Sequence, residues 1–97
     1  MPATSTPAQQ GRRIIADAFF SVNLQMRMLN ALYDAAHPMS VTELESQLRV
    51  TRRDLWSAVR AQAVLGNVRK GQPLELTAAA RAAIAAGRAA HPAAVAA

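Results

Sequence analysis

Cysteine is absent from this chain of 97 residues, and aromatic residues make up 4% of it. Without thiols the chain has no disulfide, no cysteine nucleophile and no cysteine-type zinc site. Large apolar side chains are also scarce, because 23 of the residues behind the hydrophobic fraction of 52% are Ala. A chain this short buries only about 60 to 65% of its unfolded surface. We therefore expect a single small core, with homodimerisation as a second source of stability.

Long apolar runs are missing as well. Arg, Asp or Asn interrupts every stretch that approaches the roughly 18 to 20 residues of a membrane-spanning helix. The opening segment MPATSTPAQQGRR has no apolar stretch after a charged start, unlike a secretory signal. We therefore expect a cytoplasmic protein with no membrane partner.

Patterns typical of catalysis or metal binding are missing too. His37 and His91 each precede Pro in a predicted break, and Glu43 and Glu45 diverge on a helix. The sequence has no Gly-rich phosphate loop, no Ser-His-Asp order and no metal-ligand spacing. We predict that the protein is not an enzyme and uses no cofactor, metal or small-molecule ligand.

What the chain does have is positive charge. Eleven basic residues stand against six acidic ones, for a net charge of +5, and Lys70 is the one basic residue that is not Arg. Arg binds phosphate and guanine edges through paired hydrogen bonds, whereas Lys acts as a point charge. The balance favours a nucleic-acid partner, although codon bias toward Ala and Arg would give the same composition.

A long helix is predicted over residues 13–36, because apolar residues recur there at steps of three and four. It would be roughly 36 Å long, so part of it should project from the domain. Its apolar residues form two rows about 100° apart. The first row is Ile15, Phe19, Val22, Met26, Leu29, Tyr33 and Ala36, and the second is Phe20, Leu24, Met28 and Ala31.

Two apolar rows call for two packing partners. One row would pack the domain core and the other a second copy of the helix; a single broad stripe facing the core is the alternative. We predict that Phe20, Leu24 and Met28, with Ile84 of the last helix, form the dimer interface.

Two short helices with cap sequences follow. His37-Pro38 ends the long helix. Residues 40–43 (SVTE) fit a capping box and start a helix that runs to about residue 49. Residues 51–54 (TRRD) repeat the pattern and start a second helix that runs to Gly66. Two short helices across a tight turn describe a helix-turn-helix.

A small β-hairpin is predicted next. Residues 67–69 and 74–76 form its strands, with Leu74 and Leu76 buried. Thr77 then caps a last, Ala-rich helix that ends near residue 87. The fold class is thus mainly α with a small β-hairpin. The domain covers residues 12–87, between a disordered arm (1–11) and a flexible tail (88–97).

This order of elements, over about residues 25–87, resembles the winged helix-turn-helix domain of MarR-like and PadR-like bacterial transcriptional regulators. The resemblance is carried by residues 40–44 (SVTEL), 50–53 (VTRR), 65–68 (LGNV) and 74–77 (LELT). It implies a DNA-binding regulator of the bacterial nucleoid, commonly a homodimer, with the second short helix as the reading helix and the hairpin as the wing. The sequence departs from the family at Gln62, where Leu is usual: either Gln62 caps the edge of the core or the helix ends early.

The reading helix presents cations on its outward side. On a helical wheel, Arg53, Ser57 and Arg60 point away from the core face. We expect Arg53 and Ser57 to contact bases, and the other residues to contact the DNA backbone. A merely solvated Arg face is the alternative. The predicted DNA contacts are Arg49, Thr51, Arg52, Arg53, Ser57, Arg60, Arg69 and Lys70.

The sequence therefore predicts sequence-specific binding of double-stranded DNA by a small dimeric transcriptional regulator. Its two reading helices would enter successive major grooves about 34 Å apart. One alternative is a winged-helix protein-interaction module that docks another protein on Phe20, Leu24 and Met28. A plasmid or phage replication or packaging protein is another.

Overall fold

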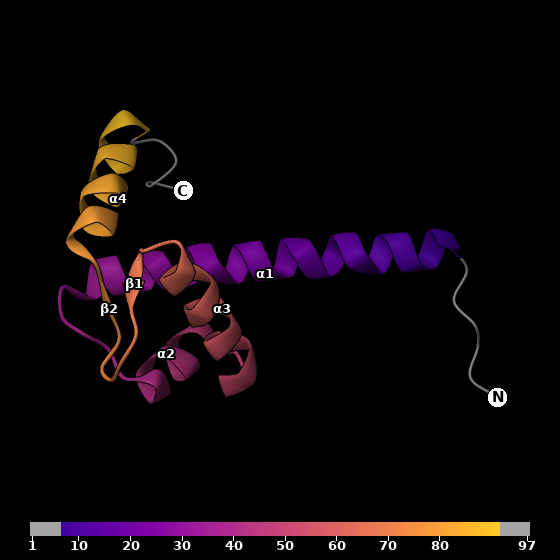
Figure 1. Ribbon diagram of the computed structural model, residues 1–97, viewed down its shortest axis with the longest axis horizontal. Coiled ribbons are helices and arrows are strands. Elements are labelled where there is room, and N and C mark those ends of the chain that lie inside the picture. The colour runs from indigo at the N-terminus through magenta and orange to yellow at the C-terminus, as the bar shows by residue number, and fades with distance from the viewer. Residues whose placement is uncertain (1–6, 92–97) are drawn as a thin grey trace.

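The computed structural model of the chain describes residues 7–91, with side chains from Ala18 onward. These residues form four helices and one two-stranded antiparallel sheet (Figure 1). The elements are α1 (Pro7–Ala35), α2 (Val41–Leu48), α3 (Arg52–Val64), β1 (Val68–Arg69), β2 (Glu75–Leu76) and α4 (Ala78–Ala90). The protein is thus a small, mainly helical domain with a hairpin between α3 and α4, consistent with a winged-helix-like arrangement. None of the helices within residues 7–91 is long and apolar enough to cross a membrane.

Helix α1 is longer than predicted. It begins at Pro7, so residues 7–11, which were expected in a disordered arm, are helical; residues 1–6 lie outside the described part. Pro is well suited to the first turn of a helix because it lacks the amide hydrogen that would have no partner there. With 29 residues the helix is about 43 Å long, and its N-terminal half extends beyond the other elements (Figure 1).

The other predicted boundary also shifts. Helix α4 continues to Ala90, past the predicted end near residue 87, so residues 88–90 are helical. Residues 92–97 of the predicted tail lie outside the described part of the chain. Gly87 does not end the helix because Ala on both sides favours the helical conformation.

The three predicted N-caps are confirmed. The Ser40 hydroxyl accepts a hydrogen bond from the Glu43 amide (3.1 Å), and the Glu43 carboxylate accepts one from the Ser40 amide (3.4 Å). The hydroxyls of Thr51 and Thr77 cap α3 and α4 in the same manner, without the return bond. Each cap satisfies an amide that has no partner within its helix, which fixes where that helix begins.

The hairpin packs against the segment that follows α1. Val68 pairs with Leu76 and Arg69 with Glu75. Beyond this pairing, Leu74 exchanges two backbone hydrogen bonds with Met39, at 2.9 and 2.7 Å. Leu74 and Leu76 are buried, as predicted. The bonds to Met39 place the hairpin beside the start of α2, so its turn lies near the helix-turn-helix.

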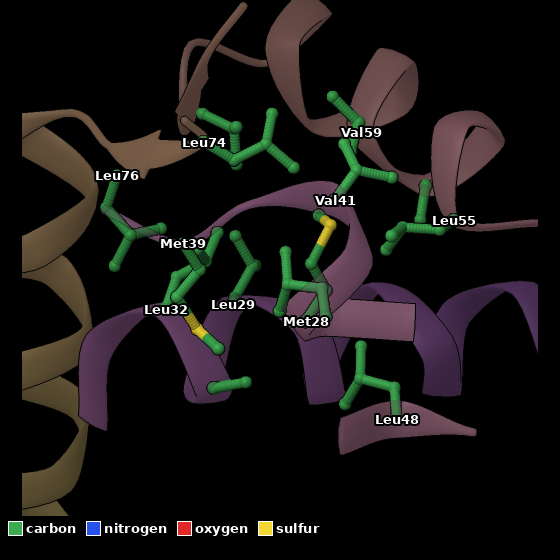
Figure 2. Packing of buried hydrophobic residues seen from close by; sticks show 14 of the residues in the cluster. Met28, Leu29, Leu32, Met39, Val41, Leu48, Leu55, Val59, Leu74 and Leu76 are labelled. Carbon is green, nitrogen blue, oxygen red and sulfur yellow. The ribbon is translucent and has the colours of Figure 1, made fainter. Parts of the chain in front are cut away.

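The core is aliphatic and draws on all four helices and the hairpin. Its fully buried large side chains are Met28, Leu32, Leu44, Leu55, Val59 and Leu74. Figure 2 shows Met28, Leu32, Leu55, Val59 and Leu74 gathered with neighbouring apolar side chains in one cluster. Burial of a Leu, Val or Met side chain contributes roughly 1.5 to 3 kcal/mol, so this cluster holds α3 and the hairpin in fixed positions on α1.

The second apolar row of α1, predicted to face a second copy of the helix, supplies core residues instead. Leu24 and Met28 are 3% and 0% exposed within the protomer's own core, so they are not available to a dimer or to another protein. Leu32 continues this row and places three large side chains where α3 and the hairpin pack. Phe20 remains half exposed beyond that region, and Ile84 is partly buried against the core.

Candidate nucleic-acid interface

The outward side of α3 carries three of the predicted DNA contacts. Arg53, Ser57 and Arg60 are all exposed, while Leu55 and Val59 on the other side are fully buried. Residues at i, i+4 and i+7 lie along one helix face, and the seven residues from Arg53 to Arg60 span about 10.5 Å. The predicted direction of these side chains is confirmed: they form an accessible polar row about two helical turns long.

The first turn of α3 is built to present backbone amides. Thr51 is extended, and its hydroxyl accepts the hydrogen bond of the Asp54 amide at 3.2 Å. The amides of Arg52 and Arg53, in the same first turn, have no acceptor within the helix and lie at the positive end of the helix dipole. The half-buried Asp54 side chain places a negative charge in the same turn, which reduces the attraction for phosphate.

Two of the predicted contacts are engaged in ion pairs. Arg52 pairs with Glu45 of α2 and also donates to the Thr42 hydroxyl at 3.3 Å. Arg69 pairs with Glu75 across the hairpin at 3.1 Å. Exposed pairs of this kind contribute about 0 to 1 kcal/mol, so phosphate can displace the carboxylate. They nonetheless lower the positive charge that these Arg side chains offer to a partner.

Four other cations have no such partner. Within the described residues, no hydrogen bond or ion pair involves the side chains of Arg49, Arg53, Arg60 or Lys70, and all four residues are exposed. Arg49 occupies the C-cap of α2 in the left-handed conformation, with φ 55°. Over residues 41–70 the sequence has six cations and three carboxylates, so this part of the molecule is positively charged.

The elements that carry these cations lie at the same end of the molecule. Figure 1 shows the hairpin turn and the first turn of α3 on the side away from α1, with α2 between them. The hairpin turn and the first turn of α3 thus lie at the same end of the domain. We refer to the exposed residues Arg49, Arg53, Ser57, Arg60 and Lys70 as the basic face.

The sequence left the placement of Gln62 in α3 open. Gln62 is buried, and α3 continues past it to Val64, so the helix does not end early. Its side-chain amide donates to the side-chain oxygen of Gln25 at 2.6 Å, and its own side-chain oxygen accepts from the side-chain amide of Asn67 at 2.8 Å. Gln62 therefore links α3 to α1 and to the residue before β1, which fixes the orientation of the basic face on the core.

A groove between α1 and α4 was not predicted from the sequence. Its volume is about 760 Å³, and its lining is mostly apolar, including Met26, Leu29, Ala83 and Ile84. The signal that α4 packs on α1 would have been Arg81 and Arg88, which lie seven residues apart and therefore on one face of α4.

Arg88 also lines this groove. Its guanidinium lies over the Tyr33 ring, 4.4 Å from the ring centre, and donates to Asp34 at 2.6 Å and to Asn30 at 3.0 Å. The hydrogen bond that Arg88 donates to the Asp34 carboxylate raises the pKa of Arg88 above its usual value. Arg81 also lies over Tyr33, at 5.3 Å. These contacts attach α4 to α1 at the end of the molecule opposite the basic face.

Comparison of the chain with protein-family models, curated proteins and solved structures found no match. A role for the basic face therefore follows from its own residues and geometry.

Proposed function

We propose that this protein binds double-stranded DNA through its basic face, as a dimeric transcriptional regulator of the winged helix-turn-helix type seen in MarR-like and PadR-like proteins. The observation that carries the proposal is the exposed row of Arg53, Ser57 and Arg60 on a helix that the core holds rigidly. Helix α3 would lie in the major groove, and the hairpin turn would reach the adjacent backbone.

The dimensions of α3 suit this role. The major groove is about 12 Å wide and admits one α-helix. The span of about 10.5 Å from Arg53 to Arg60 equals about three base pairs, at 3.4 Å for each. Arg53, near the N-terminal end of α3, is placed to read base edges, because inserted helices use their first turns for this purpose. Arg60 would contact a phosphate further along.

The unpaired cations set the expected salt dependence. If Arg49, Arg53, Arg60 and Lys70 each neutralise one phosphate, log affinity should fall with log salt at a slope of about −3.6 per protomer. Arg52 and Arg69 would add to this slope only after leaving Glu45 and Glu75.

The test is fluorescence anisotropy of labelled duplexes, first with a random-sequence pool and then with the sequences that the protein selects from it. Arg53→Ala should weaken binding to a selected duplex by roughly 5- to 150-fold and relax the preference for bases. Arg60→Ala should weaken binding to all duplexes alike.

Arg81→Ala is the matched control, because it removes the same charge from α4, at a distance from the basic face. It should leave affinity within about 2-fold. A wild-type chain that binds no duplex at low salt would refute the proposal, and so would equal losses for Arg53→Ala and Arg81→Ala.

A further inference from the structure

Large apolar side chains on α1 face solvent in one line. Phe19 is 71% exposed, Val22 58% and Met26 53%. Leu29 continues the line to the floor of the α1/α4 groove, where it is buried. We call Phe19, Val22, Met26 and Leu29 the apolar strip. It lies on the side of α1 opposite Leu24 and Met28, so folding of the single chain leaves Phe19, Val22 and Met26 uncovered. Contiguous exposed apolar surface of this kind marks an interaction site.

The spacing of the strip is the same from either end. Its members are separated by three, four and three residues, so the strip is symmetric about position 24. A two-fold dimer needs one surface that is complementary to itself. If two α1 helices pack antiparallel and cross at position 24, Val22 lies opposite the partner's Met26 and Phe19 opposite the partner's Leu29.

The α1/α4 groove extends this contact. In the antiparallel register, the partner's Phe19 reaches Leu29, which lines the groove together with Ala80, Ala83 and Ile84. A volume of about 760 Å³ holds an aromatic side chain, and the small Ala side chains let a ring approach α4 closely. The groove thus has an occupant of suitable shape on a second copy of the same chain.

Charge does not oppose the pairing. Between residues 18 and 33 the only charged residue is Arg27. Its guanidinium donates to the Leu48 carbonyl oxygen at 2.8 Å, on α2 rather than toward the strip. The strip is flanked by the uncharged Asn23 and Gln25. Depletion of charge at the centre is typical of protein interfaces.

A stable interface also requires more buried area than the apolar strip alone provides. Residues 19–29 offer a surface about 15 Å long and about 10 Å wide, whereas a stable interface buries about 800 Å² per partner. Two grooves that each receive a Phe19 ring supply part of the difference. The same register lays the backbone of residues 13–17 beside residues 31–35 of the partner, which lengthens the contact at both ends.

We propose that the apolar strip and the α1/α4 groove form the interface of a two-fold homodimer, with the α1 helices antiparallel and crossing at position 24. This inference rests on the proposed function, which makes the partner a second copy of the chain, and it specifies the surfaces through which the two copies associate. The interface lies on the side of α1 away from the core, so both basic faces stay exposed.

Sedimentation velocity over a range of concentrations tests the interface and its register together. Wild-type protein should sediment as a dimer. Val22→Lys and Met26→Asp each place a charge against an apolar residue of the partner, so each should weaken self-association by at least ~10-fold. Mixing the two variants in equal amounts should restore a dimer, because Lys at 22 of one chain then faces Asp at 26 of the other.

Gln47→Asp is the control: it adds a charge to α2 and should leave the dimer intact. Circular dichroism should show that both strip variants remain folded, since the replaced side chains are more than half exposed. A monomeric wild-type chain, or variants that dimerise as wild type does, would overturn the inference. Separate variants that are monomeric but give no dimer on mixing would overturn the register.

The DNA-binding proposal is judged independently. A monomer that still shifts duplex DNA refutes the interface and leaves the basic face as proposed. A dimer that binds no duplex refutes the DNA-binding proposal and leaves the interface as proposed.

Discussion

Replacement of Gln62 by Ala should destabilise the domain by about 3 kcal/mol, whereas Gln62→Leu should cost less than about 1 kcal/mol. Gln62 is the one polar residue among the buried residues of the described chain. Its two side-chain hydrogen bonds, to Gln25 at 2.6 Å and from Asn67 at 2.8 Å, join three elements. The pair of substitutions separates the contribution of side-chain volume from that of the amide.

The magnitudes follow from what each change removes. Gln62→Ala removes one buried methylene group, at about 0.8 kcal/mol, and two hydrogen bonds of the side-chain amide, at about 0.5 to 1.5 kcal/mol each. Gln62→Leu keeps the apolar volume and no longer buries an amide. It leaves Gln25 and Asn67 without their partner, but both are only half buried, so water can replace the lost bonds.

Urea denaturation followed by circular dichroism measures both changes in the free energy of unfolding. In a domain of this size, 1 kcal/mol corresponds to about 4 to 8 °C in Tm, so the two variants should melt more than about 8 °C apart. If Gln62→Leu is as unstable as Gln62→Ala, hydrogen bonding rather than volume dominates at this site, and the reasoning given for the network is wrong.

The left-handed residues at two helix ends, Ala36 (φ 57°) and Arg49 (φ 55°), should each gain about 0.5 to 1 kcal/mol of stability on replacement by Gly. Arg49→Gly should in addition make the salt slope of DNA binding shallower by about 0.9 per protomer, while Ala36→Gly leaves it unchanged; denaturation and anisotropy check the two effects, and a loss of stability in both variants would contradict the account. Arg88→Ala should speed hydrogen exchange in the last turns of α4, because it removes the contacts with Tyr33 and Asp34. Unchanged exchange there would show that these contacts do not hold α4.

Features set by neighbouring residues were predictable from sequence. The caps at Ser40, Thr51 and Thr77 depend on a hydroxyl and an amide three residues later, so a short motif contains the whole interaction. The alternation at Leu74 and Leu76 similarly predicts burial, because strand geometry directs both to one side. These local signals also gave the outward direction of Arg53 and Arg60.

Features set by the rest of the chain were not predictable in this way. Periodicity placed two apolar rows on α1 but could not say which row meets the core, since that depends on where α3 and the hairpin pack. Leu32 extends the row of Leu24 and Met28 into the core, and only the folded structure shows that Leu32 is fully buried, like Met28.

Charge pairing shows the same limit. A helical wheel gives the direction of Arg52 but not the presence of Glu45, which lies seven residues earlier on a different helix. The pairs made by Arg52 and Arg69 reduce the number of unpaired cations among the predicted contacts. The salt slope expected from the structure is therefore shallower than a count of basic residues alone would give.

Dimerisation and DNA binding should be linked through the salt dependence. A dimer that engages both basic faces neutralises about twice as many phosphates as a monomer, so its slope should approach −7, against about −3.6 for one protomer. Met26→Asp lies on the apolar strip and removes no cation from the basic face, yet it should halve the slope on a duplex that carries two half-sites. Arg53→Ala should instead make the slope of the intact dimer shallower by about 1.8. Anisotropy titrations at several salt concentrations distinguish these results. If Met26→Asp weakens binding without changing the slope, the two basic faces do not bind DNA together, and the dimer has some other role.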